Sequence, residues 1–368
     1  MSCEIKQKHY RKERIMTNIK ENRKIRIEWA DISKGIGILL VIIGHCVYIG
    51  GGIHNWIFSF HMPLFFILSG MFLREEPVLR FVRKKSRTLL IPYVVFCIIG
   101  LIITAVIPQW RNMLNLKNII ADIYLASPDY INVSSVWFLV TLFLSSLMFQ
   151  LCLKLKKLAF VGIILLGSCG FYIGLNGQLT GSLPAGKLPL RIDVAMTALL
   201  FLSIGYYGKN LMIRFTKLIN KKFWLRCGLC FILFAVSIIV PFFNGRVNIH
   251  EPVFNNLLIF IPGACVGTVF VIVLSVSISR MKVLQRIFVF IGQNSLIILG
   301  VQSLLIRLYI LAVISITGEE YKLYYLPPVH ALISAVTVTF FSIAIVIAYN
   351  YISKKIKEKK TDYQKYAD

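Results

Sequence analysis

The sequence is dominated by long apolar blocks, each about the length that an α-helix needs to cross a lipid bilayer. A helical span requires about 20 consecutive apolar residues. The composition agrees, since 57% of the residues are apolar and the mean hydropathy is +0.74. We therefore predict an all-α integral membrane protein built as a bundle of about ten transmembrane helices. The ten blocks cover residues 32–49, 55–73, 89–108, 134–153, 158–175, 192–208, 223–243, 254–278, 286–315 and 327–352.

The ninth block is longer than one perpendicular span requires. A helix over residues 286–315 would exceed the usual hydrocarbon thickness, so it must be tilted or broken. The two alternatives are one tilted helix and a helix broken near Gly292.

The positive charges fall mainly on one side of these predicted spans. With the N-terminus in the cytoplasm, 33 of the 41 Lys and Arg residues lie in cytoplasmic segments, seven lie outside, and Lys34 lies within the first block. This is the positive-inside rule, and it predicts cytoplasmic N- and C-termini. The net charge of +25 is therefore explained by topology and by contacts with anionic membrane lipids. It does not indicate nucleic-acid binding.

The chain divides into three regions by charge and hydropathy. Residues 1–29 form a basic cytoplasmic segment, residues 30–352 a ten-helix membrane domain, and residues 353–368 a basic cytoplasmic tail. We interpret the first block as a signal anchor that is not cleaved. The eight cysteines are scattered, and the C-x-x-C of Cys227 and Cys230 has neither a second pair nor a nearby histidine. We favour a packing role for these two residues and expect no metal site.

Three ionisable residues interrupt the first apolar block, where each costs roughly 2.5–3.5 kcal/mol to insert. Lys34 and His45 are eleven residues apart, which on a continuous helix places them within about 20° of one face and about 16 Å apart along the axis. Asp31 lies three residues before Lys34, close enough to pair with it. Two simpler interpretations stay open: Lys34 reaching the inner headgroups and His45 serving only in packing.

The second apolar block returns toward the cytoplasm and carries another histidine. Counted from the short Gly-Gly loop between the blocks, His45 and His61 lie at similar depth in an antiparallel hairpin. Two imidazoles at one level form a plausible acid–base site near neutral pH. Pro63 is expected to loosen the helix around residue 59 and to free a carbonyl near His61. We interpret His54 as an interfacial residue. The histidines to which we assign no role are His9, His250 and His330.

Five stretches, spread over residues 26–350, carry further patterns. WADISKGIGILLVIIGH contains a basic residue and a histidine separated by ten residues, here Lys34 and His45, and FSFHMPLFFILSGMF contains His61 and Pro63. The other three stretches are RKKSRTLLIPYVVF, VWFLVTLF and IGQNSLIILGVQ. Together these stretches resemble the membrane acyltransferase-3 family, especially its fucose 4-O-acetylase-like branch. The first two motifs are specific in combination, whereas each of the last three is weak alone.

The resemblance implies a catalytic role for the histidines and a donor site at the cytoplasmic mouth. By resemblance, His45 is the general base that deprotonates the acceptor hydroxyl, and His61 supports it. The residues implied to hold an anionic acyl-CoA are Lys34, Asp31, Lys84 and Arg87. Family members often carry two arginines three residues apart before the proline of the third span. Here that segment reads Arg-Lys-Lys-Ser-Arg, so the assignments of Lys84 and Arg87 depend on an inexact match.

A second set of residues is implied to bind the acceptor or to stabilise a developing oxyanion. These residues are Ser69, Trp137, Arg191, Asp193, Asn294 and Gln302. Trp137 could instead be an interface anchor or a core aromatic residue, and Arg191 with Asp193 could instead be an exposed local ion pair. The late motif of the family often ends in histidine, but this chain has Gln302, which can form hydrogen bonds but cannot transfer a proton.

The sequence thus predicts a membrane O-acyltransferase that moves an acetyl or other short acyl group from acyl-CoA to a cell-surface glycan or its lipid-linked precursor. Acyl-CoA, with acetyl-CoA as the expected form, is a donor substrate here, and we expect no permanently bound cofactor. The expected partners are membrane lipids, acyl-CoA and the acceptor, in a bacterial cell membrane. A glycan transporter or flippase, or an accessory protein of polysaccharide assembly, is the alternative. The acceptor sugar, the acyl group, a covalent intermediate and the oligomeric state are left open by the sequence.

Overall fold

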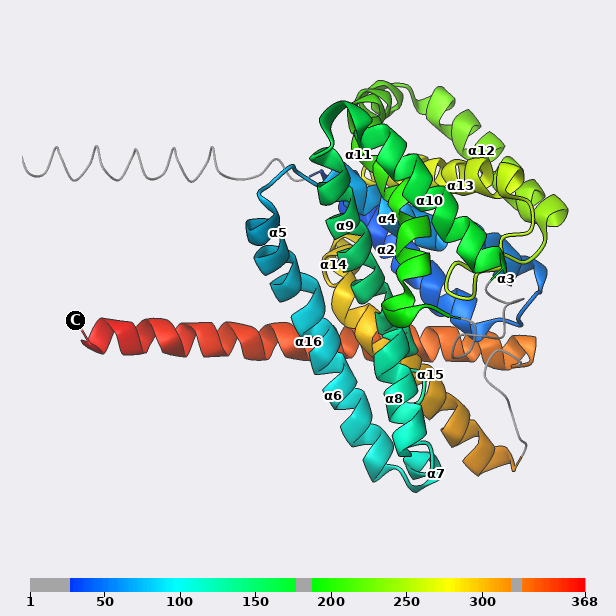
Figure 1. Ribbon diagram of the computed structural model, residues 1–368. Coiled ribbons are helices and arrows are strands. Elements are labelled where there is room, and N and C mark those ends of the chain that lie inside the picture. The colour runs from blue at the N-terminus through cyan, green and yellow to red at the C-terminus, as the bar shows by residue number, and fades with distance from the viewer. Residues whose placement is uncertain (1–26, 177–186, 319–325, 368) are drawn as a thin grey trace, which may run out of the picture.

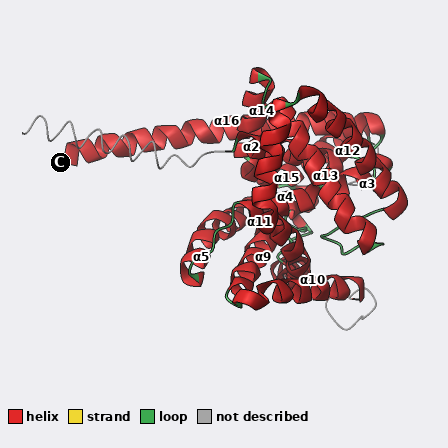
Figure 2. Ribbon diagram, turned by 90° about the horizontal axis from the view of Figure 1, so that it is seen from above, coloured by secondary structure: helices red, strands yellow, loops and turns green. Residues whose placement is uncertain are grey.

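A computed structural model of the chain describes residues 27–176, 187–318 and 326–367, and every regular element in these ranges is a helix. The one strand-like pairing within them is an isolated bridge between Asn248 and Val253. Figures 1 and 2 show helices throughout, which confirms the predicted all-α membrane fold. Most of the predicted N-terminal segment, residues 1–26, lies outside the described residues.

Nine helices in the described ranges are long and apolar enough to cross a bilayer. The spans formed by single helices are α2 (Glu28–Cys46), α12 (Phe223–Asn244), α13 (Leu257–Ile278), α15 (Ser295–Thr317) and α16 (Pro328–Ala367). The others are α5 (Val78–Lys85) with η1 (Ser86–Leu90) and α6 (Ile91–Val106), η2 (Ser134–Val136) with α9 (Trp137–Leu153), η3 (Lys156–Leu158) with α10 (Ala159–Asn176), and η5 (Pro189–Arg191) with α11 (Ile192–Lys221). Following the orientation predicted from charge, we call the end of the bundle at Glu28 the inner end and the end at Cys46 the outer end.

The second predicted span is not one continuous helix. α3 (Gly52–Phe58) and α4 (His61–Met71) are separated by Ser59 and Phe60, and Phe60 has a non-helical backbone (φ −143°, ψ −15°). Pro63 is the third residue of α4. The break therefore lies where the missing donor of Pro63 was predicted to loosen the helix.

The ninth predicted block is broken rather than tilted. The break lies at Asn294, two residues after the predicted position, and separates α14 (Lys282–Gln293) from α15. α14 packs directly on the inner half of α2, because a Cβ atom at Gly292 would overlap the carbonyl oxygen of Asp31. Only glycine allows two helix backbones to approach this closely.

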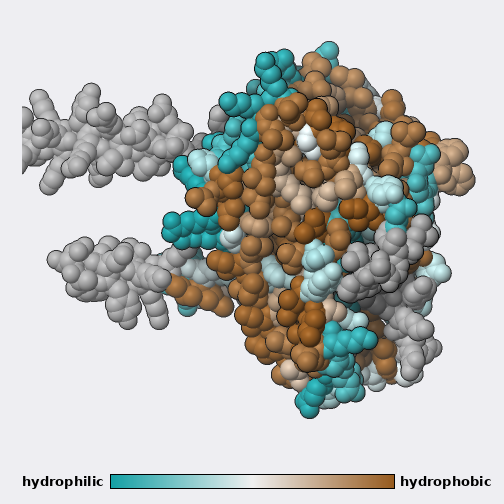
Figure 3. Space-filling model, in the orientation of Figure 1, coloured by the Kyte–Doolittle hydropathy of each residue, from teal (hydrophilic) through white to brown (hydrophobic). Residues whose placement is uncertain are grey.

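The bundle has a buried centre and a lipid-facing rim. α2, α9 and α11 are the most buried spans, whereas α12 is the least buried. Figure 1 shows α2, α4 and α9 in the middle of the molecule, with α6 and α12 at its edges. The face in Figure 3 is mostly hydrophobic, with hydrophilic residues gathered at its left margin and lower end. At the outer end, α6 is followed by the short helices α7 (Pro108–Arg111) and α8 (Leu116–Leu125).

Candidate active site

The first apolar block forms a single uninterrupted helix. α2 runs from Glu28 to Cys46 without a kink, with Lys34 near its inner end and His45 in its last turn. The helical geometry assumed for the sequence therefore applies, and the two side chains lie on one face about 16 Å apart along the axis. We call this face of α2, from Lys34 at the inner end to His45 at the outer end, the α2 line.

His45 and His61 meet at the ring of Phe58. The centroid of the His45 ring lies 5.9 Å from that of Phe58 in an edge-on arrangement, and the His61 centroid lies 4.6 Å from Phe58, also edge-on. His61 is only 3% exposed. The structure therefore brings the two predicted imidazoles together around one aromatic ring.

The break between α3 and α4 fixes the orientation of His61. Its Nδ1 lies 2.9 Å from the carbonyl oxygen of Ile57. A carbonyl oxygen can only accept, so Nδ1 must donate, and in the neutral ring Nε2 carries the free lone pair. The carbonyl that the break releases thus selects the tautomer of His61, and Nε2 is left as the nitrogen that can act as a base.

His54, which we interpreted as an interfacial residue, is buried in the bundle rather than exposed. Its side chain is 2% exposed and its ring stacks on Phe58, with 3.9 Å between centroids and 18° between planes. His54 therefore joins His45 and His61 as the third imidazole around Phe58. The sequence contains a signal for this, because His54, Phe58 and His61 are spaced four and three residues apart, as neighbours on one face of a helix are.

At the inner end, Lys34 is held by an acidic and an aromatic side chain. Its Nζ lies 3.8 Å from Oδ1 of Asp31 and 5.5 Å from the ring centroid of Phe72 at the end of α4. The lysine side chain keeps about a third of its surface exposed, with a relative accessibility of 34%. The predicted pairing of Lys34 with Asp31 is present, and the lysine side chain is partly exposed at the inner end.

The basic residues of α5 and η1 are arranged differently from the pattern that the sequence suggested. Lys84 is exposed and pairs with Glu76, and this hydrogen bond lowers the pKa of the Glu76 carboxyl. Arg87 is exposed on η1, a π-helical turn. The half-buried Lys85 is the residue whose charge interacts with Lys34. Lys85, which the sequence analysis did not select, therefore extends the basic group at the inner end.

At the outer end, a loop between α12 and α13 carries His250 onto Trp137. The two rings stack with 4.6 Å between centroids and 25° between planes, and His250 Nε2 lies 3.1 Å from Ser127 Oγ. Ser127 Oγ donates its single hydrogen to Asp129 Oδ2 at 2.8 Å, so Nε2 must donate to Ser127. Burial, together with the charges of Arg191, Lys187 and His45, holds the pKa of His250 well below its ordinary value.

This arrangement leaves Nδ1 of His250 as a buried lone pair without a hydrogen-bond partner in the described part of the chain. A proton on His45 would disfavour one on His250, so the two histidines lie close enough to interact and the loop belongs to the same outer region as the Phe58 cluster. Sequence reasoning assigned His250 nothing, because Ser127 and Trp137 come from distant segments of the chain.

Arg191 and Asp193 form a buried ion pair rather than an exposed one. Arg191 Nη2 lies 3.1 Å from Asp193 Oδ2, and the two side chains are 1% and 4% exposed. Leu190 and Arg191 both have left-handed backbones (φ 52°), a strained conformation that for non-glycine residues is common at functional sites. Arg191 Nη1 is buried and has no hydrogen-bond partner in the described ranges.

The remaining three predicted residues are not brought to this outer region as a group. Ser69 lies eight residues after His61 on α4, about 12 Å toward the inner end. Asn294 lies at the inner end, where its Nδ2 donates to the carbonyl of Phe290. Gln302 is fully buried on α15 and donates to Ser135 Oγ at 3.2 Å, just before Trp137. Ser69 and Asn294 are therefore too far inward to act beside His45 in this conformation.

Comparisons with known proteins identify the family of this chain. Residues 27–347 match the profile of the acyltransferase-3 family, which is described as an acyltransferase domain. The chain belongs to the acyltransferase-3 family. No curated protein and no solved structure matches the chain. Together with its membrane-spanning helices, the family match makes this protein a membrane acyltransferase.

The chemistry available to this acyltransferase is that of neutral imidazoles and fixed cations. Among the described residues, no group of three or more His, Cys, Asp or Glu side chains could hold a metal ion. The two ends of the α2 line differ: the inner end offers ammonium groups for an anion, and the outer end offers imidazole nitrogens for proton transfer.

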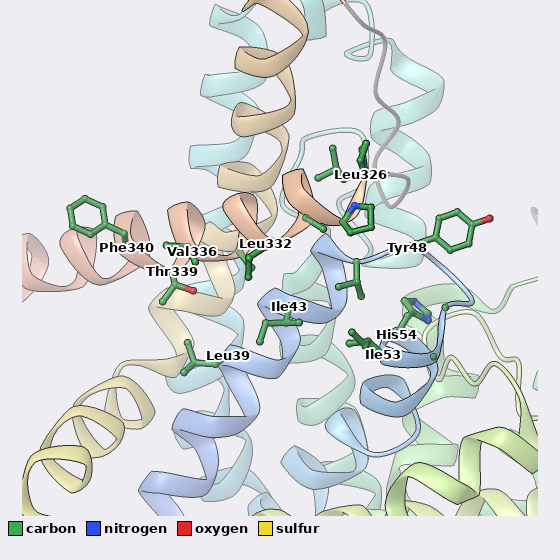
Figure 4. Close-up of a pocket in the computed structure, with 17 residues that line it drawn as sticks. Leu39, Ile43, Tyr48, Ile53, His54, Leu326, Leu332, Val336, Thr339 and Phe340 are labelled. Atoms are coloured by element: carbon green, nitrogen blue, oxygen red, sulfur yellow. The ribbon is translucent and has the colours of Figure 1, made fainter. Parts of the chain in front are cut away.

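The acyltransferase also contains an apolar groove of about 970 Å³ between α2 and α16. Figure 4 shows Leu39 and Ile43 of α2 facing Leu332 and Val336 of α16, with His54 at one end. The groove shares His54 with the Phe58 cluster but lies on another face of α2 from Lys34. It therefore does not follow the face of α2 that carries Lys34 and His45.

Proposed function

We propose that this chain is an O-acyltransferase that moves an acetyl or other short acyl group from acyl-CoA to a hydroxyl of a cell-surface glycan or its lipid-linked precursor. The observation that carries the proposal is the α2 line, with Lys34 at its inner end and His45 beside Phe58 and His61 at its outer end. The resemblance to the fucose 4-O-acetylase-like branch supports a sugar as the acceptor.

On the donor side, the phosphates of CoA bind the cations at the inner end. Lys34 is partly exposed there, and Lys85 lies close enough for their charges to interact. Ammonium groups are suitable partners for phosphate because each presents a concentrated positive charge. The long pantetheine arm then extends along the α2 line, over about 16 Å, and carries the thioester to His45, which requires the buried Ile38 and Val41 on that face to shift aside.

The acyl group is transferred at the outer end. His45 takes the proton of the acceptor hydroxyl, the oxygen forms a bond to the thioester carbonyl carbon, and the carbon–sulfur bond breaks. The proton then passes from His45 to the sulfur of CoA, which leaves as a thiol. His61 keeps Nε2 free through its bond to Ile57 and stabilises the reacting groups beside Phe58. Positioned bases of this kind contribute roughly 10²–10⁴-fold to a rate.

On the acceptor side, the polar groups of the outer loops bind the sugar. Arg191 Nη1 offers an unpartnered donor and His250 Nδ1 an unpartnered acceptor, while Trp137 supplies an aromatic surface. Both nitrogens are enclosed in this conformation, so binding requires a local shift of the side chains around them. A site that leaves its own polar groups unsatisfied discriminates strongly for a ligand that satisfies them. We place this reaction in a bacterial cell membrane, with the acceptor outside.

The test is acyl transfer by the purified full chain in proteoliposomes. Labelled acetyl-CoA and succinyl-CoA are supplied as donors, and a panel of methyl hexosides and methyl deoxyhexosides as acceptors. We expect transfer by the wild type and a loss of roughly 10²–10⁴-fold in the His45→Ala variant, because that substitution removes the general base.

His330→Ala is the matched control, since it removes a histidine of α16 that contacts Tyr309 and takes no part in the proposed chemistry. It should transfer at close to the wild-type rate. Wild-type activity in the His45→Ala variant would refute the assigned base. Transfer to no sugar, combined with movement of a labelled glycan lipid across the vesicle membrane, would support a flippase instead.

A further inference from the structure

We propose that the groove between α2 and α16 binds the hydrocarbon chain of a lipid-linked sugar acceptor, so that the sugar is acylated while its carrier stays in the bilayer. The inference deepens the proposed function and rests on it. It selects the lipid-linked precursor over a free or fully assembled glycan as the acceptor.

The lining of the groove suits a hydrocarbon chain and little else. Only three of its side chains carry a polar group, namely Tyr48, His54 and Thr339. The walls are aliphatic, and two of their residues, Leu332 and Val336, are 67% and 62% exposed although both are apolar. A sugar or a nucleotide would lose its hydrogen bonds to water here without replacement, which disfavours both as occupants.

The shape of the groove matches an extended ligand. Its volume of about 970 Å³ is at the upper end of the range for small-molecule sites. In Figure 4 the labelled side chains extend from Phe340 at one end to Tyr48 and His54 at the other, along both helices. The lining residues of α16 run from Pro328 to Phe340, which corresponds to about 18 Å of helix.

The groove and the α2 line, along which we propose that acyl-CoA binds, lie on opposite faces of α2. Ile43 is nine residues after Lys34, and nine helical steps of 100° place the two side chains 180° apart. An acyl-CoA bound along the α2 line would therefore not compete with a chain in the groove. Two substrates of different polarity can occupy the same helix at once, one on each side.

The two paths converge at the outer end, at His54. This residue lines the groove and stacks on Phe58, whose ring also contacts His45 and His61. The charges of Arg246 and Glu251 act on His54, so polar loops adjoin this end of the groove. A head group that leaves the groove at His54 therefore enters the polar region beside the proposed base. A sugar placed here lies beside the proposed base, which favours a substrate chain over a structural phospholipid, whose head group takes no part in acyl transfer.

The test compares two forms of one acceptor. Proteoliposomes are given labelled acetyl-CoA with either a methyl hexoside or the same hexose linked to a polyprenyl phosphate. The Val336→Trp variant places a large ring in the groove at an exposed position of α16. We expect it to lower the rate with the lipid-linked hexose by about tenfold or more, equivalent to about 1.4 kcal/mol. The rate with the methyl hexoside should change less than about twofold.

Ile347→Trp is the matched control, because Ile347 is an exposed aliphatic residue of the same helix that does not line the groove. It should leave both rates unchanged. Equal loss with both acceptors, or no loss with either, in the Val336→Trp variant overturns the groove assignment. Wild-type transfer to neither acceptor would instead refute the proposed function.

A second measurement does not depend on a variant. A polyprenyl phosphate carrying a photoreactive diazirine is crosslinked to the wild-type protein in the same vesicles. We expect labelled peptides from residues 39–54 and 326–340, and competition by the lipid-linked hexose. Equal competition by an ordinary phospholipid would show that the groove holds only bulk lipid, which would also overturn the proposal.

Discussion

At the scale of single residues, His61 has two nitrogens with separable roles. Nδ1 donates to the carbonyl of Ile57 and so braces the break between α3 and α4. Nε2 is the nitrogen that the proposed chemistry uses. Asparagine places an amide where Nδ1 lies, whereas glutamine reaches the position of Nε2, so the two substitutions separate bracing from chemistry.

We predict that His61→Gln retains more acyl transfer than His61→Asn, and that His61→Asn unfolds closer to the wild-type temperature. The reason is that glutamine keeps a polar group near the reacting atoms, and asparagine keeps a donor for the Ile57 carbonyl. Initial rates and thermal unfolding in detergent measure the two effects. A His61→Asn variant with wild-type activity would mean that His61 only braces the helices.

Residue-level reasoning from the sequence succeeded where the contacts were local. The shared level of His45 and His61 followed from a short loop, and the pairing of Lys34 with Asp31 followed from helical spacing. The contacts of His250 could not be predicted, since its partners Ser127 and Trp137 lie more than 100 residues away. His54 was a missed local signal rather than an unpredictable contact.

At the scale of elements, the helix α4 that carries His61 is held against α11 by two glycines. A Cβ atom at Gly70 would overlap the carbonyl oxygen of Leu202, and one at Gly205 would overlap that of Ile67. The two backbones therefore touch at the middle of the bundle. The position of His61 depends on this contact because α4 has no other way to approach α11 as closely.

We predict that Gly70→Ala and Gly205→Ala each destabilise the protein by about 1–3 kcal/mol or more, because the added methyl group must push the two backbones apart. Thermal unfolding of the purified variants measures the loss. Gly208→Ala is the control on the same helix, as its Cβ would meet open space. It should be neutral or stabilising by up to about 1 kcal/mol, since alanine favours helix more than glycine does. Equal effects at all three positions would contradict the packing argument.

The extent to which elements could be predicted depended on the kind of signal that each one carries. Long apolar blocks predicted the nine helices in the described ranges that are long enough to cross a bilayer, whereas the tenth predicted span is the broken pair α3 and α4, whose break Pro63 indicated. The break after α14, at Asn294, was two residues away from the expected glycine. Gly292 proved to serve close packing against Asp31, which is a tertiary constraint that spacing along one helix does not reveal.

At the scale of the whole molecule, the proposed mechanism depends on how the bundle is oriented in the membrane. The basic residues at the inner end must face the compartment that contains acyl-CoA, and the imidazoles around Phe58 must face the acceptor. The distribution of 33 basic residues on one side and seven on the other predicts this orientation. Asn112, after α7, and Lys222, between α11 and α12, are exposed positions on opposite sides in this scheme.

We predict that a cysteine at Asn112 reacts with a membrane-impermeant thiol reagent in intact cells, and that one at Lys222 reacts only after the membrane is opened. Each is introduced into a variant whose native cysteines are replaced and which still transfers the acyl group. Residue 112 and His45 both lie at the outer end of the bundle. The side of the membrane on which residue 112 reacts is therefore also the side of His45. The reverse pattern would place His45 in the cytoplasm and Lys34 outside, where the inner cations could not bind cytoplasmic acyl-CoA, and the proposed transfer along α2 would then be impossible.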